Sequence, residues 1–224
     1  MKIIRVIAAA AILAMPGLAA AQNFTPNILL FDNQCTGSTS YYPQALANMG
    51  LAFTKTTTPD SFYAALTSVT RWDLVLVDAY GDSLTGPTHT ALIDFIQNGG
   101  HCVLNYWGLN ETLDAAFGAK QFITNSTYYA FYEIPQPVKR WNPGHPLLTT
   151  PHTIPDLTPV QNTCNIDGYY LEPLSGSTAV AGYTPTAASN QAAIVVGNEG
   201  RTILLGITPG LFGPDMRNLL ENCI

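Results

Sequence analysis

The sequence predicts a doubly wound α/β domain, in which a mostly parallel sheet has helices on both faces and a β-rich hairpin region follows late in the chain. Strand-like and helix-like segments alternate with short connections from residue 27 to residue 117, an order typical of parallel sheets. The apolar run at 74–77 is continuous rather than alternating, which favours a strand buried on both faces. Two later apolar runs flank the turn residues 197–200, which indicates a hairpin.

The strands expected in the first half are apolar, β-branched or aromatic segments bounded by polar or glycine residues. They cover residues 27–32, 51–56, 72–78, 102–107 and 121–124. The helices between them cover residues 42–48, 88–97 and 111–117, with another that opens at residue 59. Because crossovers between parallel strands are right-handed, the carboxyl ends of the first, third and fourth strands should lie side by side on one edge.

Two of these helices have a clear buried face. The helix that opens at Pro59, with Thr58 or Asp60 as its N-cap, should bury Phe62, Leu66 and Val69. The buried residues expected on the helix at 88–97 are Leu92, Phe95 and Ile96.

The alternation weakens in the second half, where a proline-rich segment at 135–159 predicts a long ordered loop. The expected later strands cover residues 128–135, 166–171, 179–183, 192–196 and 202–207. A glycine-rich turn at 209–213 and a closing helix at 215–222 complete the chain.

The first 21 residues read as a secretory signal peptide, with a basic start, an apolar middle and an A-x-A site that predicts cleavage after Ala21. The apolar run is shorter than the ~20 residues that a spanning helix needs. We therefore expect a secreted or periplasmic protein, with residues 22–224 forming a single domain and no membrane span in the mature chain. Oligomeric state is left open.

The acidic balance argues against nucleic acid as a partner. The formal net charge is −6, and removal of Lys2 and Arg5 with the signal peptide makes it two units more negative. Such a chain is a poor binder of phosphate backbones or anionic membranes.

Four cysteines, Cys35, Cys102, Cys164 and Cys223, remain after cleavage, and their spacing does not fit a zinc site. An exported protein with an even number of cysteines favours disulfides, of which three pairings are possible. If the closing helix runs antiparallel to the strands, Cys223 ends near Cys102, and Cys35 and Cys164 form the other pair. The alternative is that Cys102 is a buried apolar residue of a strand.

The helix that ends in Asn98-Gly99-Gly100 before a buried strand, together with the strand–helix units that precede it, resembles the class I glutamine amidotransferase-like superfamily. The similarity covers residues 27–119 and is closest to the secreted, ThuA-like and uncharacterised branches. It implies a flavodoxin-like sheet with a functional edge at the carboxyl ends of the strands.

In the amidotransferases proper, a G-x-C-x-G turn after this strand carries the nucleophilic cysteine. When the turn is aligned on Gly108, Tyr106 stands at the nucleophile position and Leu104 replaces the first glycine. A phenol with a pKa near ~10 is a poor substitute for a thiolate. The resemblance therefore implies a member without amidotransferase chemistry, and residues 208–210 contain neither the histidine nor the acid expected late in the chain.

A second, weaker resemblance is to flavodoxins. The loop at 34–39 is similar in spacing to their phosphate loop, and Tyr80-Gly81-Asp82 to their flavin-stacking loop. This implies FMN as a cofactor. The alternative, a polar loop that caps a helix, requires none.

Polar and aromatic residues should gather at the predicted edge. Asp32, Asp78 and Asp82 could hold a divalent cation; the alternative is that Asp32 and Asp78 accept hydrogen bonds from loop N–H groups or cap helices. A neutral sugar or another flat ligand would suit aromatic faces beside carboxylates and amides. The remaining candidates for such a pocket are Asn33, Tyr80, Asn105, Tyr106, Trp107 and His145.

His145 could act as a base or ligand, or fix its loop by hydrogen bonding. The other histidines show no metal spacing. The leading hypothesis is an exported, non-catalytic binding or interaction domain with no cofactor and no metal, whose ligand is a small molecule or carbohydrate. The alternatives are a secreted hydrolase or carbohydrate-modifying enzyme that uses Asp or His, and an FMN-binding protein.

Overall fold

The computed structural model is described for residues 25–34, 40–79, 84–106, 108, 110–122, 136–160 and 168–224. One sheet, with the strand order β2-β1-β3-β4-β10-β9-β7-β5, runs through the described domain. Strands β2, β1, β3, β4 and β10 are parallel, and the strands beyond β10 are antiparallel. Two further strands lie off this path, where β8 pairs with β9 and β6 pairs with β8.

The parallel half contains β1 (Ile28–Asn33), β2 (Thr54–Thr56), β3 (Leu74–Ala79), β4 (His101–Tyr106) and β10 (Thr202–Leu205). The antiparallel half contains β5 (Ala119–Phe122), β6 (Lys139–Arg140), β7 (Tyr170–Pro173), β8 (Thr178–Gly182) and β9 (Ala192–Gly197). The predicted α/β class, with a parallel sheet and a late hairpin region, is confirmed.

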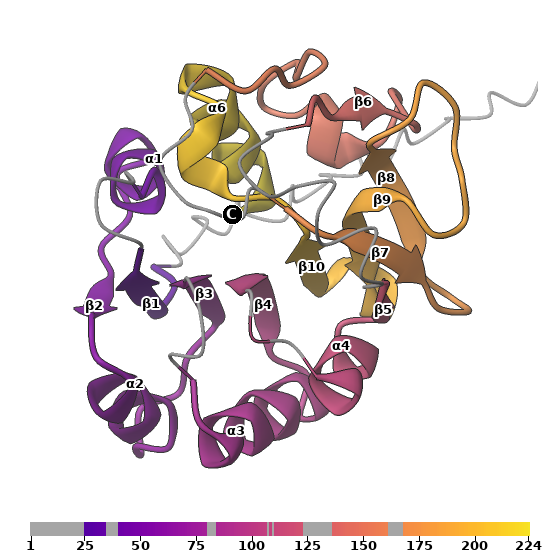
Figure 1. The fold of residues 1–224 in the computed structure, drawn as a ribbon. Helices are drawn as coiled ribbons and strands as arrows, with labels where there is room; N and C mark the ends of the chain where they lie inside the picture. The colour runs from indigo at the N-terminus through magenta and orange to yellow at the C-terminus, as the bar shows by residue number, and fades with distance from the viewer. Residues whose placement is uncertain are drawn as a thin grey trace, which may run out of the picture.

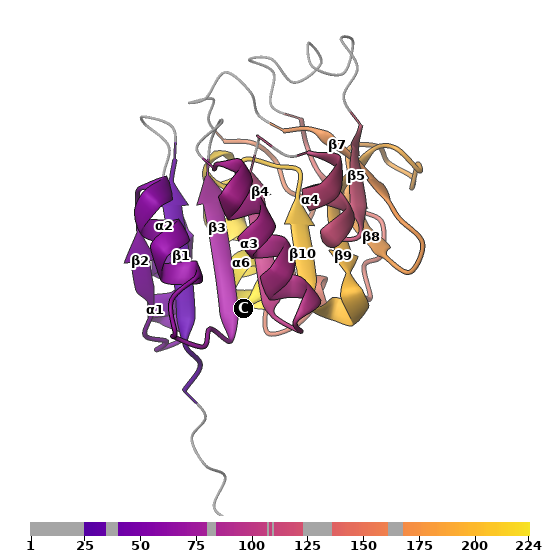
Figure 2. The same ribbon diagram turned by 90° about the horizontal axis from the view of Figure 1, so that it is seen from below.

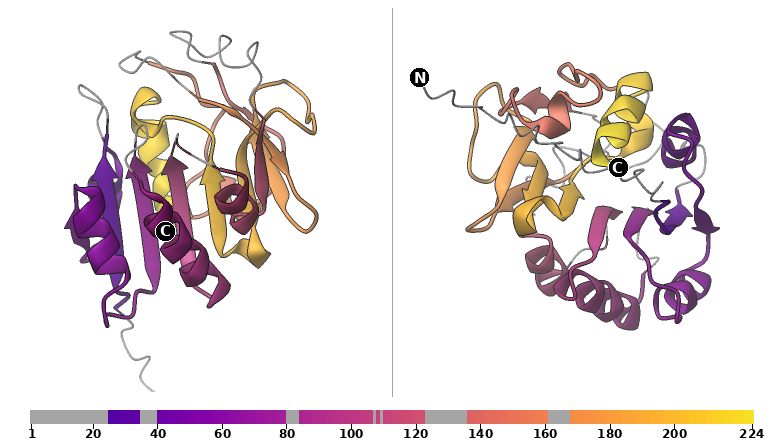
Figure 3. Two further views of the ribbon diagram at one scale, coloured as in Figure 1. Left: turned by 60° about the horizontal axis from the view of Figure 1, so that its bottom comes forward. Right: turned by 180° about the vertical axis from the view of Figure 1, so that it is seen from behind.

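Helices cover both faces of the sheet. Figure 1 looks along the strands, with α1 (Tyr42–Asn48) and α6 (Pro214–Cys223) above the sheet. Below it lie α2 (Pro59–Leu66), α3 (Gly86–Gln97) and α4 (Glu111–Ala116). The views in Figure 3 show the same two layers, with α1 beside α6. The core is accordingly divided into two hydrophobic clusters, one on each side of the sheet.

The parallel strands share a direction, so their carboxyl ends form one edge (Figure 2). All six residues of β3 are buried, as its continuous apolar run predicts for a central strand. Along β3, Val75 and Val77 face the α2–α4 side, whereas Leu74 and Leu76 face α1 and α6. This alternation decides where each polar residue at the strand ends points.

Local sequence explains the start of α2. Thr58 accepts a hydrogen bond from the Ser61 backbone N–H, and Ser61 completes a capping box. The helix ends at Leu66, so Val69 is fully exposed and the predicted burial of Val69 is wrong. The other two residues of the predicted stripe, Phe62 and Leu66, are buried.

The predicted hairpin joins β9 and β10. Their connection is a short 3-10 turn, η2 (Asn198–Gly200). Two other 3-10 turns, η1 (Pro146–Leu148) and η3 (Pro209–Leu211), lie elsewhere in the chain. In η2, Asn198 and Glu199 take φ values of 50° and 58°, the left-handed conformation that a tight hairpin turn requires. The expected strand at 128–135 lies outside the described residues.

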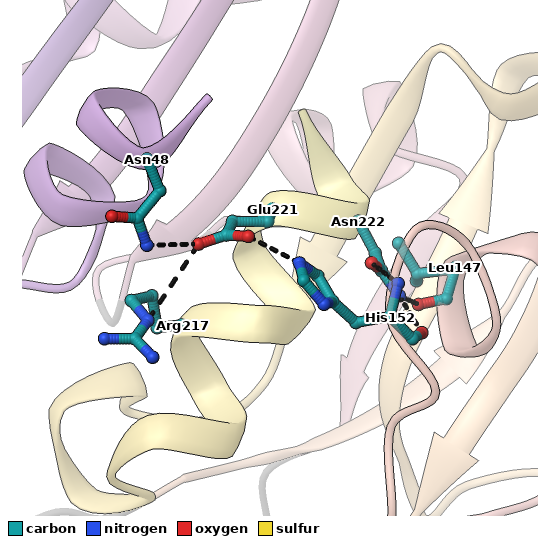
Figure 4. Close-up of polar contacts among 6 residues, drawn as sticks. All are labelled: Asn48, Leu147, His152, Arg217, Glu221 and Asn222. Atoms are coloured by element: carbon teal, nitrogen blue, oxygen red, sulfur yellow. Dashed lines mark hydrogen bonds and ion pairs between the residues drawn. The ribbon is translucent and has the colours of Figure 1, made fainter. Parts of the chain in front are cut away.

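Helix α6 is tied to α1 and to the long loop by a polar cluster (Figure 4). Glu221 accepts a hydrogen bond from Asn48 Nδ2 at 2.7 Å and lies 2.5 Å from His152 Nε2. Arg217 Nε lies 3.9 Å from Glu221 Oε1, the same oxygen that accepts from Asn48. Asn222 accepts from the His152 N–H and donates to the carbonyls of Leu147 and His152.

Within the described residues, the helices are all too short or too polar to cross a bilayer.

Candidate functional site

The carboxyl ends of β1, β3 and β4 lie side by side, and the pairing register aligns three polar residues across them. Asp32 is opposite Asp78, and Asp78 is opposite Asn105. All three face the α1–α6 side, because the residues two positions earlier on each strand belong to that core cluster. The fold therefore builds one polar row from residues that are far apart in sequence.

Asp78 is the centre of this row and is completely buried. Neither of its carboxylate oxygens has a hydrogen-bond partner of normal geometry among the described residues. Polar atoms of Gln34 and Ser40 nearby are likewise buried and unpaired within the described part of the chain.

Burial is the main reason that the pKa of Asp78 is raised from 3.8 to about 7, and the charge of Asp32 adds to the rise. Ser40 and Gln34 lie close enough to offset part of it, although their geometry falls short of a hydrogen bond. Asp78 is therefore a carboxyl group that titrates near neutral pH at the functional edge of an α/β sheet.

The other two residues of the row, Asp32 and Asn105, already have partners. Asp32 forms an ion pair with Lys55, at 2.6 Å between Oδ2 and Nζ. The side-chain amide of Asn105 donates to the Leu205 carbonyl at 3.3 Å and also to the Ile207 carbonyl. Of the three residues in the row, Asp78 is thus the one without a hydrogen-bond partner of normal geometry among the described residues.

Tyr106 lies on the opposite side of the sheet from Asp78. It ends β4 one residue after Asn105, belongs to the core cluster on the α2–α4 side, and is 1% exposed. Its hydroxyl contacts the backbone N–H and carbonyl of Leu84 at 3.3 Å each, and its ring meets His89 edge-on. The expected neighbourhood of Tyr106, Asp32 and Asp78 is therefore wrong, because adjacent strand residues point to opposite faces.

The other predicted residues divide into three groups. Asn33 ends β1 opposite Ala79 and so faces away from Asp78. His145 caps η1, accepting a hydrogen bond from the Leu147 N–H at 3.1 Å, which matches the loop-fixing interpretation. The residues Tyr80, Asp82, Trp107, Cys35 and Cys164 lie outside the described part of the chain.

The predicted bond between Cys102 and Cys223 is not formed, and both are free, buried thiols. The closing helix does run as expected, and both cysteines line one cavity at the amino ends of the strands. Cys102, however, faces the α2–α4 side and Cys223 faces the α1–α6 side. The central sheet therefore separates the two side chains.

The sequence patterns did not single out two polar residues, the buried Asp114 and the partly exposed His89. Asp114 on α4 is 2% exposed, and burial raises its pKa to about 6. His89 on α3 lies 2.7 Å from Asn110 through Nδ1, and its buried Nε2 has no partner among the described residues. An acidic residue on the apolar face of a short helix was the available signal for Asp114, and no sequence signal pointed to His89.

The described residues contain no group of three His, Cys, Asp or Glu side chains that could hold a metal ion. Asp32 and Asp78 alone supply two carboxylates, one of them already paired with Lys55. The third residue of the predicted cation site, Asp82, lies outside the described part.

Comparisons with known proteins agree with this architecture. No protein-family model and no curated sequence matches the chain. Similar solved structures include a glutamine amidotransferase from Thermotoga maritima, with a TM-score of 0.54 and 13% identity over 88% of this chain and 82% of that one. A ThuA-like protein from Parabacteroides merdae has a TM-score of 0.54 and 10% identity over 89% of both chains.

The carbohydrate deacetylase Agd3 is also similar, with a TM-score of 0.52 and 17% identity over 89% of this chain but 31% of that one. At such low identities the likeness concerns the fold alone. The strand order, the helices on both faces and these neighbours together show that the chain has the class I glutamine amidotransferase-like fold.

Proposed function

We propose that this protein is an exported, non-catalytic ligand-binding domain whose ligand site lies at the carboxyl ends of β1, β3 and β4. The observation that carries the proposal is Asp78, a fully buried carboxyl group without a hydrogen-bond partner among the described residues. An unsatisfied buried polar group costs about 1–3 kcal/mol of folding stability, and more when it is charged. Within the described part of the chain, no hydrogen bond of normal geometry offsets this cost, which supports a bound ligand as the partner of Asp78.

The chemistry around Asp78 suits a ligand rich in hydroxyl groups. Ser40 and Gln34 can donate and accept hydrogen bonds, and the carboxyl group of Asp78 accepts them when ionised. A hydroxyl group likewise donates and accepts, so several can be satisfied at once. A small polyol or neutral saccharide is therefore the first ligand class to test.

The test is a thermal-shift and calorimetric screen of neutral mono- and disaccharides against the mature chain. Binding to the wild type should weaken at least tenfold in Asp78→Asn. Asp94→Asn, on the exposed side of α3, is the matched control and should bind as the wild type does. Tyr106→Phe should also leave binding intact, because the phenol faces the other side of the sheet.

Binding that is equally strong in Asp78→Asn would contradict the proposed site. Turnover of an ester, amide or glycoside that required Tyr106 or His145 would contradict the non-catalytic assignment.

A second candidate is a secreted hydrolase or carbohydrate-modifying enzyme. It is favoured by the pKa of Asp78, about 7, which suits a residue that exchanges protons at neutral pH. One structure of similar fold is that of a carbohydrate deacetylase. Release of acetate from acetylated saccharides by the wild type but not by Asp78→Asn would favour this alternative over simple binding.

A further inference from the structure

Buried polar atoms without partners gather around Asp78, on the α1–α6 side of the sheet. Six such atoms within the described residues belong to Gln34, Ser40, Tyr42 and Asp78. Gln34 directly follows β1, Ser40 lies two residues before α1, and Tyr42 is the first residue of α1. The passage from β1 to α1 therefore brings three of these side chains to the end of β3, where Asp78 lies.

Tyr42 belongs to this group by both position and burial. It is 0% exposed and packs in the same core cluster as Leu76, two positions before Asp78. Burial is the main reason that the pKa of the Tyr42 phenol is raised, and the charge of Asp78 is among the smaller causes. The two groups are therefore within electrostatic range of each other.

The atoms without partners are mainly hydrogen-bond acceptors. Five of the six are oxygen atoms, and the sixth is the side-chain nitrogen of Gln34. The ionised carboxylate of Asp78 and the side-chain carbonyl of Gln34 only accept hydrogen bonds, whereas the hydroxyl groups of Ser40 and Tyr42 can donate or accept. A partner for this group must therefore supply hydrogen-bond donors.

The local charge favours a positive partner. Asp78 forms no ion pair within the described residues, and the charge of Asp32 acts against its ionisation. Lys55 is engaged with Asp32, 2.6 Å from its Oδ2 atom. An unpaired buried carboxylate is stabilised most by a cation that also donates hydrogen bonds to it.

A primary ammonium group fits these observations better than a divalent metal ion does. Calcium and magnesium sites in proteins are usually built with several carboxylates, and the described part of the chain holds no group of three side chains that could bind a metal. An ammonium group carries one positive charge and three N–H donors. These properties match a single free carboxylate that is surrounded by oxygen acceptors.

The position of Asp78 limits the size of the group that contacts it. Asp78 is completely buried, whereas Gln34 and Ser40 are half-buried and continue the polar group toward the surface. A compact head group can therefore reach Asp78 while the rest of the ligand stays with Gln34 and Ser40.

We infer that the ligand is an amino sugar, whose primary ammonium group binds Asp78 and whose neighbouring hydroxyl groups bind Gln34 and Ser40. This inference rests on the function proposed above and narrows its ligand class from saccharides in general to those that carry an amine.

The test compares three probes by calorimetry at pH 7 with the mature wild-type chain. Glucosamine carries the amine, glucose has a hydroxyl group in its place, and N-acetylglucosamine has a neutral amide. Glucosamine should bind about tenfold more tightly than either neutral sugar, the lower range for a hydrogen bond to a charged group.

Two variants assign this preference to Asp78. In Asp78→Asn, glucosamine should lose about tenfold more affinity than glucose, so that the two sugars bind equally within about twofold. Asp94→Asn, which removes an exposed carboxylate of α3, should keep the wild-type preference. Ser40→Ala should weaken glucosamine and glucose alike, by about threefold, because both use the hydroxyl contact.

The outcomes separate this inference from the proposed function. Glucose or N-acetylglucosamine binding as tightly as glucosamine to the wild type would overturn the inference and leave the proposed function in place. A preference for glucosamine that persists in Asp78→Asn would also overturn it. If none of the three sugars binds and the neutral saccharide screen is also negative, the proposed function itself fails. The comparison of the three sugars on the wild type needs no variant, so a variant that fails to fold leaves the test intact.

Discussion

At the scale of single residues, Asp78 is a completely buried carboxyl group at the carboxyl end of β3. Its pKa is raised from 3.8 to about 7, chiefly by burial, so the folded protein favours the protonated form. Because the pKa of this carboxyl group is higher in the folded than in the unfolded chain, its contribution to stability is fully present at pH values below 3.8. The contribution is lost as the pH rises toward 7. The difference between the two pKa values corresponds to about 4 kcal/mol of folding free energy.

The first prediction follows from this sign. Asp78→Asn should raise the free energy of unfolding by a few kcal/mol at pH 8 and change it little at pH 4, because the amide cannot ionise. Urea unfolding at the two pH values measures the effect. A variant equally stabilised at both values would show that the carboxyl group is not the source.

The residue scale is also where sequence reasoning erred. Asp78 and Tyr106 were both correctly expected at the ends of neighbouring strands, yet they point to opposite faces. Asn105, one position before Tyr106, is the residue that faces the Asp78 side. Adjacent residues of a strand point to opposite faces of the sheet, so an error of one residue places a side chain on the wrong face. Only the pairing register shows which residues share a face.

At the scale of elements, α6 is held by Glu221. Burial by itself raises the Glu221 pKa, but hydrogen bonds from Asn48 and His152, and the charges of His152 and Arg217, lower it below the ordinary value of 4.5. A lowered carboxyl pKa stabilises the fold above that value, and the stabilisation is lost as the pH falls through the folded-state pKa.

The second prediction therefore has the opposite pH dependence. Glu221→Gln should lower the free energy of unfolding by about 1.5–3 kcal/mol at pH 6.5, since it weakens hydrogen bonds to a charged group. The loss should shrink as the pH falls through the folded-state pKa of Glu221, because the wild-type carboxylate then becomes protonated. Thermal unfolding between pH 3 and pH 7 checks this, with Glu199→Gln as an exposed control. A loss independent of pH would contradict the charge-based account.

A third prediction tests the end of α2. Leu66→Ala should destabilise the protein by about 2–3 kcal/mol, because Leu66 is 9% exposed and packs in the core. Val69→Ser should change stability by less than about 0.5 kcal/mol, because Val69 is fully exposed beyond the helix. Denaturation midpoints of the two variants measure these changes in stability. Equal losses of stability in both variants would mean that the helix continues past Leu66.

At the scale of the whole molecule, the central sheet separates residues that sequence alone would pair. Cys102 and Cys223 lie at the same edge of the domain but on different faces. We predict that unfolding without reductant in the presence of iodoacetamide alkylates both cysteines completely. Peptide mapping measures this, and a peptide linking Cys102 to Cys223 would contradict the arrangement.

Much of the architecture was accessible from local patterns. The continuous apolar run of β3, the cap of α2 at Thr58 and the turn between β9 and β10 each follow from a few neighbouring residues. The edge strand β2 is shorter than expected, because half of the apolar segment at 51–56 precedes it. The sequence predicts which residues stand at the ends of the strands. It does not predict the face of the sheet to which each of their side chains points.

By itself, the sequence determined the α/β class, the order of the elements and the placement of Asp32, Asp78 and Asn105 at one edge of the sheet. Those features depend on periodicity and capping, which act over a few residues. The tertiary structure alone decided that Asp78 is buried without a hydrogen-bond partner of normal geometry among the described residues, and that Tyr106 faces away from it. Burial and facing depend on strand register and on helices packed from distant parts of the chain, and no local pattern encodes these.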